Sequence, residues 1–502
     1  MNEPKDDRSA PVVVMGAGPA GLTAALELTR SSTPCLVLES EAAVGGLSKT
    51  VEHSGYRFDI GGHRFYTKVS VIKKLWEEVL GDDLLTRPRL SRIYFNGRYF
   101  DYPLKAGNVL SNLGFVEAAR CIASYGKARL FPLLPEDSLE DWVINRFGER
   151  LYGMFFKSYT EKVWGIPCRN VDSAWAAQRI RGLSLASAAI AALLPNRGQP
   201  AAKTLINSFQ YPRLGPGMLW DRVAGMVCGQ GGEVKLNSPV TRIQWRPGEI
   251  QGVEAAGKYY PVRNLLSSLP IRDLIRRMDP APPDYLLEAA DLFHYRDFLM
   301  VALVLPVREV FPDNWIYIHE PSVRVGRIQN FKNWSQDMVP SPEMTCLGME
   351  YFCFEDDGLW SMSDQDLVRL ASEELARLGL CGETPLDAAV IRTPKAYPVY
   401  DASYRRGLDA IRRFLSETPN LQLIGRNGMH HYNNQDHSML TGLLAARNIL
   451  GASYDLWRIN ADESFLEDDG VISIEELEAL RASQPAVPAA VGSVDHRRNP
   501  QR

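Results

Sequence analysis

The stretch from residue 11 to residue 39, PVVVMGAGPAGLTAALELTRSSTPCLVLE, decides the fold of this chain. Its first part, Pro11–Met15, is a short apolar run that predicts a buried strand, and it leads directly into three glycines spaced as G-x-G-x-x-G. Helical composition follows over Ala24–Leu28, and a second apolar run, Cys35–Leu38, ends at Glu39. The order strand, glycine turn, helix, strand and acid is typical of a dinucleotide-binding βαβ unit.

Each glycine of this unit has its own task. Gly16 permits a tight turn, Gly18 lets the backbone approach a pyrophosphate, and Gly21 lets the helix pack closely on the strand. The N-terminus of the helix then offers unpaired N–H groups to the diphosphate. Glu39 follows the third glycine at close to the roughly 20 residues at which an acid binds a ribose hydroxyl. The residues that we expect to contact the nucleotide here are Gly16, Gly18, Pro19, Ala20, Gly21, Glu39 and Ser40.

The composition of the whole chain excludes several classes of protein. The 502 residues are 45% apolar and 23% charged with a net charge of −4, which excludes a disordered or fibrous chain and argues against a nucleic-acid partner. The seven cysteines form no C-x-x-C pair, so we expect no metal site. The first residues contain no apolar signal region, and the longest apolar run, Leu183–Leu194, is shorter than the roughly 20 residues that span a bilayer. We therefore expect a cytoplasmic protein.

A second glycine pair distinguishes between two dinucleotide cofactors. Gly45 and Gly46 follow the acid at a spacing that NAD does not require. The pattern resembles the E-x-x-x-x-x-G-G extension of flavoproteins in the amine oxidase and glutathione reductase clan, in which these backbone amides approach FAD. In that clan the segment that matches Gly55–Thr67 passes beside the isoalloxazine ring. The resemblance therefore implies FAD, with further contacts from Gly46, Leu47, Ser48, Gly61, Gly62, His63, Arg64 and Phe65.

The whole chain resembles the amine oxidase/protoporphyrinogen oxidase clan of FAD enzymes, and three of its segments resemble UDP-galactopyranose mutase. Residues 62–67, GHRFYT, are similar to that family's G-x-H-x-F-H-T beside the flavin. Residues 159–165, YTEKVWG, are similar to Y-T-K-K-Q-W-G. Residues 425–436, GRNGMHHYNNQD, are similar to G-R-x-G-x-Y-x-Y-x-D-x-D.

This resemblance implies roles for individual residues. His63 would lie against the flavin and tune it, Trp164 would line the substrate cleft, and Tyr432 matches a tyrosine that contacts a substrate phosphate. Arg179 or Arg181 matches an arginine that stabilises the flavin or the diphosphate. The implied catalytic residues are His63, Arg64, Trp164, Arg179, Tyr432 and Asn434. The implied cofactor contacts from the second half of the chain are Val240, Gly425, Arg426, Asp436, Met439 and Leu440.

Two departures keep the chemistry open. Asn434 stands where the mutase family has an aspartate, and that family's second phosphate arginine has no evident counterpart. In addition, Asn264–Pro270 resembles the strand-to-proline segment of protoporphyrinogen oxidases and desaturases. Three functions therefore remain: redox or isomerase chemistry at flavin N5 on a nucleotide sugar or other glycosyl substrate, net oxidation of a non-sugar substrate, and non-catalytic escort as in GDP-dissociation inhibitors. NADPH or NADH could serve as an external reductant.

The motif positions predict an α/β fold: a Rossmann-type, glutathione reductase-like FAD domain with inserted substrate-binding regions. We expect a discontinuous FAD domain over 1–75, 214–275 and 420–455, a mostly helical region over 76–213, a mixed α+β region over 276–419, a helical extension over 456–480 and a disordered tail over 481–502. A helix over Ser438–Leu450 would direct its N-terminal dipole at the flavin. The run Leu183–Leu194 is open to four interpretations: a lid, a core helix, a peripheral membrane contact or a homodimer face.

Overall fold

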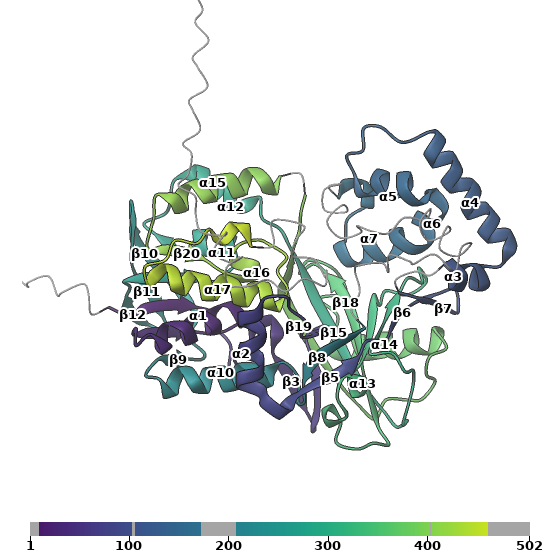
Figure 1. Ribbon diagram of the computed structural model, residues 1–502, viewed down its shortest axis with the longest axis horizontal. Coiled ribbons are helices and arrows are strands. Elements are labelled where there is room, and N and C mark those ends of the chain that lie inside the picture. The colour runs from purple at the N-terminus through teal and green to yellow at the C-terminus, as the bar shows by residue number, and fades with distance from the viewer. Residues whose placement is uncertain (1–9, 103–105, 172–206, 402, 460–502) are drawn as a thin grey trace, which may run out of the picture.

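The computed structural model describes residues 10–102, 106–171, 207–401 and 403–459 (Figure 1). Arg179 and the run Leu183–Leu194 lie outside the described residues, as do the expected tail and nearly all of the expected C-terminal extension.

A five-stranded parallel sheet forms the centre of one half of the molecule, with the strand order β20-β13-β1-β2-β9. All four residues of β1 and all four of β2 are buried, as expected for a parallel sheet covered on both faces. The strands come from three distant parts of the chain, so the sheet is complete only when both ends have folded together. Their bounds are β1 Val12–Met15, β2 Cys35–Leu38, β9 Glu233–Lys235, β13 Asn264–Ser267 and β20 Leu421–Leu423.

Two helices from opposite ends of the chain pack on this sheet and on each other. They are α1, Pro19–Arg30, and α17, Gln435–Ile449. Their contact is close because Gly442 of α17 faces Ala20 of α1: a Cβ on this glycine would lie 2.0 Å from the Ala20 carbonyl oxygen. The remaining helices of this half are α2 Ser70–Leu80, α10 Gly217–Gly229, α11 Ile271–Arg276, α12 Asp284–Asp291, α15 Tyr404–Ser416 and α16 Gly425–Gly428.

The start of α17 differs from the sequence prediction. The helix begins at Gln435, three residues before the predicted Ser438. Asn434 has the extended backbone of an N-cap residue (φ −70°, ψ 174°), and no proline or glycine interrupts the polar residues that follow. Residues 435–437 form the first turn of the helix but are all polar. The predicted start was wrong because these residues do not show the apolar period from which the helix was predicted.

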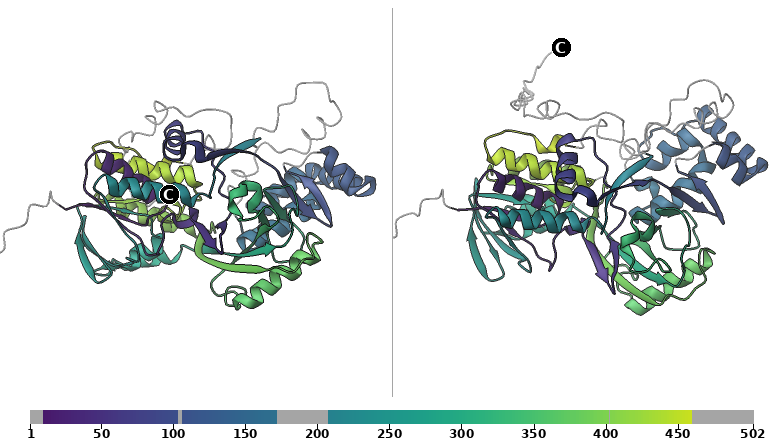
Figure 2. Two further views of the ribbon diagram at one scale, coloured as in Figure 1. Left: turned by 90° about the horizontal axis from the view of Figure 1, so that it is seen from below. Right: turned by 60° about the horizontal axis from the view of Figure 1, so that its bottom comes forward.

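A four-stranded sheet lies beside the parallel sheet, and a seven-stranded mixed sheet forms the core of the other half (Figures 1 and 2). The four-stranded sheet has the order β12-β11-β10-β14, with β10 Val240–Arg246, β11 Glu249–Ala255, β12 Lys258–Pro261 and β14 Met278–Asp279. The seven-stranded sheet has the order β19-β15-β18-β17-β16-β6-β7, with β6 Ser91–Phe95, β7 Arg98–Asp101, β15 Tyr295–Leu305, β16 Trp315–Ile318, β17 Arg327–Asn330, β18 Thr345–Cys353 and β19 Asp387–Pro398. The helices α13 Phe331–Trp334 and α14 Asp364–Arg377 pack against it.

Two short ribbons connect the halves. One pairs β3 Thr50–His53 with β4 Tyr56–Asp59, and the other pairs β5 Leu84–Pro88 with β8 Ser208–Pro212. The first ribbon leads into Gly61 and Gly62, the glycines of the predicted flavin segment.

The interval 76–213 contains strands as well as helices. After the end of α2, the helices in the described part of this interval are α3 Ala106–Leu113, α4 Phe115–Leu130, α5 Leu139–Phe147, α6 Glu149–Tyr152 and α7 Ser158–Trp164. It also supplies β6 and β7, which complete the seven-stranded sheet, and β5 and β8. A signal for the β6–β7 hairpin is present in the sequence: Asn96–Gly97 has positive φ at both residues, 49° and 70°, as this dipeptide does in tight hairpin turns.

Within the described ranges, no helix is both long enough and apolar enough to cross a bilayer.

The α1–α17 contact gives a stability prediction. Gly442→Ala would place a methyl group against the Ala20 carbonyl, and we expect this overpacking to lower the free energy of unfolding by about 1–3 kcal/mol. Gly225→Ala is the matched control, since this glycine also lies inside a helix but has open space around its Cβ position. The control should be neutral or more stable by up to about 1 kcal/mol. Urea unfolding followed by circular dichroism measures both, and equal midpoints for the two variants would contradict the prediction.

Candidate active site

A cradle of backbone atoms stands at the carboxyl end of β1. Gly16 has φ +99°, and a Cβ there would lie 2.2 Å from the Ser268 hydroxyl; a Cβ on Gly21 would lie 1.9 Å from the Gly16 carbonyl oxygen. Gly18 precedes α1 and faces Gly46, whose added Cβ would lie 3.1 Å from the Gly18 Cα. Because side chains are excluded, the N–H groups at the start of α1 can approach a diphosphate closely.

Glu39 lies at the end of β2, beside this cradle, and is buried. Its carboxylate accepts hydrogen bonds from the backbone N–H of Ala17 at 2.7 Å and of Glu41 at 2.9 Å, and from the Ser40 hydroxyl at 3.1 Å. These three donors fix the carboxylate where the sequence predicts a ribose contact.

An open cleft lies between the two halves, and Leu47, the residue after Gly46 of the cradle, is part of its wall. The start of α17 forms part of its wall, and the loop after β4 and the strands β17 and β19 form other parts. The predicted site residues that line it are Leu47, Gly61, Gly62, His63, Arg64, Arg426, Tyr432, Asn434 and Asp436. Other lining residues, absent from the prediction, include Lys68, Trp76, Phe298, Arg327, Tyr397, Gln435 and His437.

His63 presents an unsatisfied ring atom at the cleft wall. The residue as a whole keeps partial exposure, but its Nδ1 atom is buried and has no hydrogen-bond partner among the described residues. Burial lowers the pKa of His63 to about 3, and the charges of Arg426 and Arg327 act in the same direction. The ring is therefore neutral at pH 7 and can exchange hydrogen bonds with a bound group without carrying charge.

Gln435 offers a second unsatisfied atom at the first turn of α17. Its Oε1 accepts a hydrogen bond from the Ser48 hydroxyl, while its buried Nε2 has no partner within the described ranges. The side-chain-free cradle and these two orphaned atoms fit a flavin dinucleotide, whose ring carries both donors and acceptors.

A stack of two tyrosines and one guanidinium lines the wall opposite. The rings of Tyr397 and Tyr432 lie 5.7 Å apart with an interplanar angle of 13°, and the Arg426 guanidinium carbon lies 5.3 Å and 4.8 Å from their centres. Arg426 is held in place by bonds of 3.0 Å to the carbonyls of Asn433 and Ala396. The result is a flat aromatic wall with a positive charge lying over its rings.

A buried ion pair supports this wall. Arg327 on β17 donates to Glu350 on β18, and the Gln329 amide donates to the other carboxylate oxygen at 3.0 Å. Glu350 is fully buried, and burial raises its pKa although Arg327 acts against this. The sequence prediction missed Arg327 because its strand, RIQN, carries no motif; only the fold brings it to the cleft.

Trp164 ends α7 and does not line the cleft itself. Its ring centre lies 6.5 Å from that of Tyr432, so it packs behind the aromatic wall. Lys162 anchors the helix: its ammonium donates to the carbonyls of Ile318, Glu320 and Val325 at 2.6–3.3 Å, and burial lowers its pKa to about 8.

Several other predicted cofactor residues lie outside the cleft wall. Met439 and Leu440 are fully buried, and the Met439 sulfur accepts a hydrogen bond from the Trp76 indole at 3.2 Å. Phe65 is buried 4.8 Å from the Trp76 ring, and Val240 begins β10 in the core. The side chains of these residues pack in the core, and their contacts with the cofactor stay a prediction. Gly425 begins α16, where its N–H donates to the Thr441 hydroxyl at 2.9 Å.

A match to a family model accompanies this geometry. The model of flavin containing amine oxidoreductases matches residues 19–450. The chain belongs to this family. It is therefore an FAD-dependent flavoenzyme of the amine oxidase superfamily, and the predictions of clan, fold class and enzymatic nature are confirmed.

Solved structures show the same fold. A reduced UDP-galactopyranose mutase is 20% identical, with 91% of this chain and 99% of that chain covered and a TM-score of 0.80. A protein assigned as a protoporphyrinogen oxidase from Exiguobacterium sp. 255-15 is 17% identical, with 88% and 98% covered and a TM-score of 0.68. A putrescine oxidase bound to putrescine is 16% identical, with 88% and 99% covered and a TM-score of 0.59.

Similarity to a curated protein is confined to a short stretch. The inactive all-trans-retinol 13,14-reductase of Danio rerio is 48% identical over 50 residues. The match covers 10% of this chain and 8% of that protein's length.

Asp59 gives a pH prediction for the segment that carries His63. This buried carboxylate accepts hydrogen bonds from the hydroxyls of Tyr211 and Thr50, but burial outweighs them and raises its pKa to about 7. Between pH 4 and 7 the native protein thus binds more protons than the unfolded chain, so its stability falls as the pH rises through this window.

The amide side chain of the Asp59→Asn variant cannot ionise, so this variant should not lose stability in the same way as the pH rises. From pH 4 to pH 8 we expect its unfolding free energy to increase relative to the wild type by up to ~4 kcal/mol, measured by urea unfolding across the range. The exposed Asp291→Asn serves as control and should keep the wild-type profile. A profile of Asp59→Asn that runs parallel to the wild type would show that this carboxyl is ionised throughout.

Proposed function

We propose that this flavoenzyme acts on a phosphate-bearing glycosyl substrate, either by oxidation or by redox-neutral isomerisation. The observation that carries the proposal is the convergence of three guanidinium groups, those of Arg64, Arg327 and Arg426, and two stacked tyrosines on one cleft beside the glycine cradle. Guanidinium forks match phosphate oxygens, and aromatic faces suit the C–H faces of sugars or a nucleobase.

The cofactor's place follows from the chain's own atoms. When bound, FAD supplies a ring that exchanges hydride and, in its reduced form, a nucleophilic nitrogen. The backbone around Gly18 and Gly46 would hold its diphosphate, and the carboxylate of Glu39 its ribose. The first turn of α17 would stabilise negative charge near the ring through its N–H groups. Neutral His63 would orient a ring edge by hydrogen bonding.

The substrate would lie between the flavin segment and the aromatic wall. Arg64 is partly exposed in the cleft, and burial lowers the pKa of its guanidinium. A guanidinium stays charged in proteins, so Arg64 remains a cation. Arg64 and Arg426 would bind the phosphate, while Tyr432 and Tyr397 would exclude water from one face of the sugar. Among acidic residues, Asp436 lines the cleft, where it is a candidate for proton transfer.

The first test removes one cation. Arg64→Ala should raise KM for a nucleotide-sugar substrate about 10- to 100-fold in the FAD-loaded enzyme, because a charge-assisted bond to phosphate is lost. Arg57→Ala is the matched control, since Arg57 lies on β4 and pairs with Glu52 away from the cleft. Steady-state kinetics measure both, and an unchanged KM for Arg64→Ala would remove the phosphate from the proposal.

The second test separates the two reaction types. Oxidised holoenzyme is titrated anaerobically with nucleotide sugars, lipid-linked sugars and amines while the visible flavin band is recorded. Bleaching by a sugar indicates oxidation, and turnover only after reduction by dithionite or by NADPH or NADH indicates isomerisation. Bleaching by amines alone, with no response to any sugar, would replace the proposal with net oxidation of a non-sugar substrate.

A further inference from the structure

The helix α4 exposes an unusual amount of apolar surface at the end of the molecule farthest from the five-stranded sheet (Figures 1 and 2). Phe115 is 89% exposed, Ile122 62% and Leu130 76%. The exposed apolar side chains continue into the following segment, residues 131–135, FPLLP, where Leu134 is 79% exposed. We define the α4 face as Phe115, Val116, Ala119, Ile122, Leu130 and residues 131–135.

The face is one side of an amphipathic helix. At about 100° per residue, Phe115, Ile122 and Leu130 lie within one sector about 80° wide. The opposite side is seated on the protein, where Ala118, Cys121 and Ala128 are buried. The helix is therefore anchored by one side and exposes its large apolar residues on the other. These residues form a contiguous patch, unlike the single apolar residues that are normally scattered over a protein surface.

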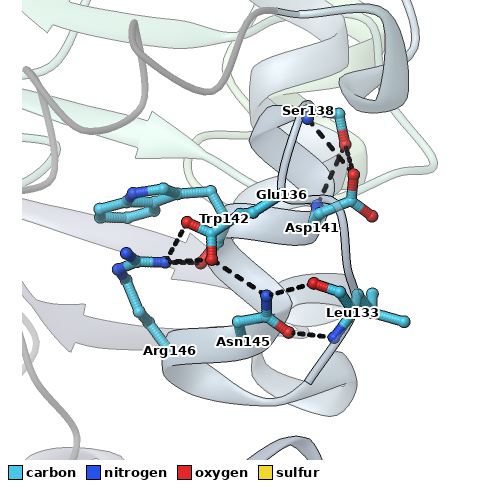
Figure 3. Close-up of polar contacts among 7 residues, drawn as sticks. All are labelled: Leu133, Glu136, Ser138, Asp141, Trp142, Asn145 and Arg146. Atoms are coloured by element: carbon cyan, nitrogen blue, oxygen red, sulfur yellow. Dashed lines mark hydrogen bonds and ion pairs between the residues drawn. The ribbon is translucent and has the colours of Figure 1, made fainter. Parts of the chain in front are cut away.

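The segment after α4 is held in this position (Figure 3). Asn145 accepts a hydrogen bond from the Leu133 N–H at 2.8 Å and donates to the Leu133 carbonyl at 3.0 Å. Glu136 binds the same amide and also pairs with Arg146 at 2.7 Å. The backbone N–H and carbonyl of Leu133 are thus both hydrogen-bonded within the protein, and the Leu133 side chain points away from Asn145.

The charges beside the α4 face select its partner. Lys127 and Arg120 border the apolar sector on one side and Arg129 borders it on the other, all exposed. The nearest acid on the helix, Glu117, pairs with Arg150 and Arg120. Lys127 and Arg129 form no ion pair with any residue that the structure describes. Cations therefore flank the helical part of the α4 face on a chain whose net charge is −4, while the acids Glu136 and Asp137 follow its last residue.

We propose that the α4 face docks this protein on an anionic phospholipid surface. A helix with aromatic and leucine side chains between basic flanks lies in the plane of a bilayer interface, with its apolar residues in the acyl boundary and its cations at the lipid phosphates. A second copy of the chain suits the face less well, because a two-fold contact would bring the same cations together. The helix lies along the surface and does not cross the bilayer.

The test measures binding of the full-length holoenzyme to vesicles by co-sedimentation. Vesicles of phosphatidylcholine and phosphatidylglycerol at 7:3 should bind the protein, pure phosphatidylcholine should bind it at least 10-fold more weakly, and raising the salt from 0.1 to 0.5 M should weaken the anionic binding. Phe115→Ser/Phe131→Ser and Lys127→Glu/Arg129→Glu should each reduce binding at least 10-fold at unchanged melting temperature. The matched controls are Leu386→Ser, at an exposed leucine elsewhere, and Lys258→Glu.

Three results would overturn the proposal. The first is binding to neither vesicle, and the second is binding that the Phe115→Ser/Phe131→Ser variant retains. The third is an oligomer in light scattering that this variant converts to monomer, which would assign the α4 face to a second copy. None of these results depends on turnover, so the docking surface and the proposed reaction are tested separately.

Discussion

The contact of three backbones around Gly16, Gly21 and Gly442 is the constraint on which the rest of the structure depends. Each of these positions excludes a Cβ because a main-chain carbonyl or a serine side chain already occupies its place. As a result α1 lies close to β1 on one side and to α17 on the other. The N-termini of both helices then point toward the same region, one at the cradle and one at the cleft. The site is positioned by how closely the backbone can pack.

The other half of the molecule places a charged group in the cleft from a strand of its sheet, and that charge needs compensation. Arg327 lies on a strand whose other residues are buried. Its charge is compensated there because it donates to the Glu350 carboxylate, whose other oxygen accepts a hydrogen bond from the Gln329 amide. Removing one member would leave the other charge buried and uncompensated, a change that typically costs several kcal/mol. Arg426 avoids this cost by donating to carbonyls and lying over aromatic faces, so its position depends on Tyr397 and Tyr432.

The sequence predicts the cofactor half well and the substrate half poorly, for a physical reason. Glycine spacing, a strand-terminal acid and helix periodicity are local signals, and they were enough to place Gly16, Gly18 and Glu39 together. Arg327 enters the sheet through the pairing of β17 with β18, and Tyr397 through the pairing of β19 with β15. The pairing of β15 with β18 joins the two, and these non-local events leave no pattern in either segment. The β6–β7 hairpin is different, because the sequence does contain a signal for it, the Asn96–Gly97 turn. This hairpin could therefore have been predicted.

The strand order of the parallel sheet has a consequence for how the protein is made. The ribosome produces β1 and β2 first, yet β20 and α17 follow about 380 residues later, roughly 20–80 s at bacterial or eukaryotic elongation rates. Throughout that interval the face of α1 that α17 will cover is exposed, and the cleft lacks the wall that the start of α17 forms. The cleft can therefore be completed only after α17 has been synthesised, so the N-terminal half of the βαβ unit spends most of synthesis without the helix that covers it.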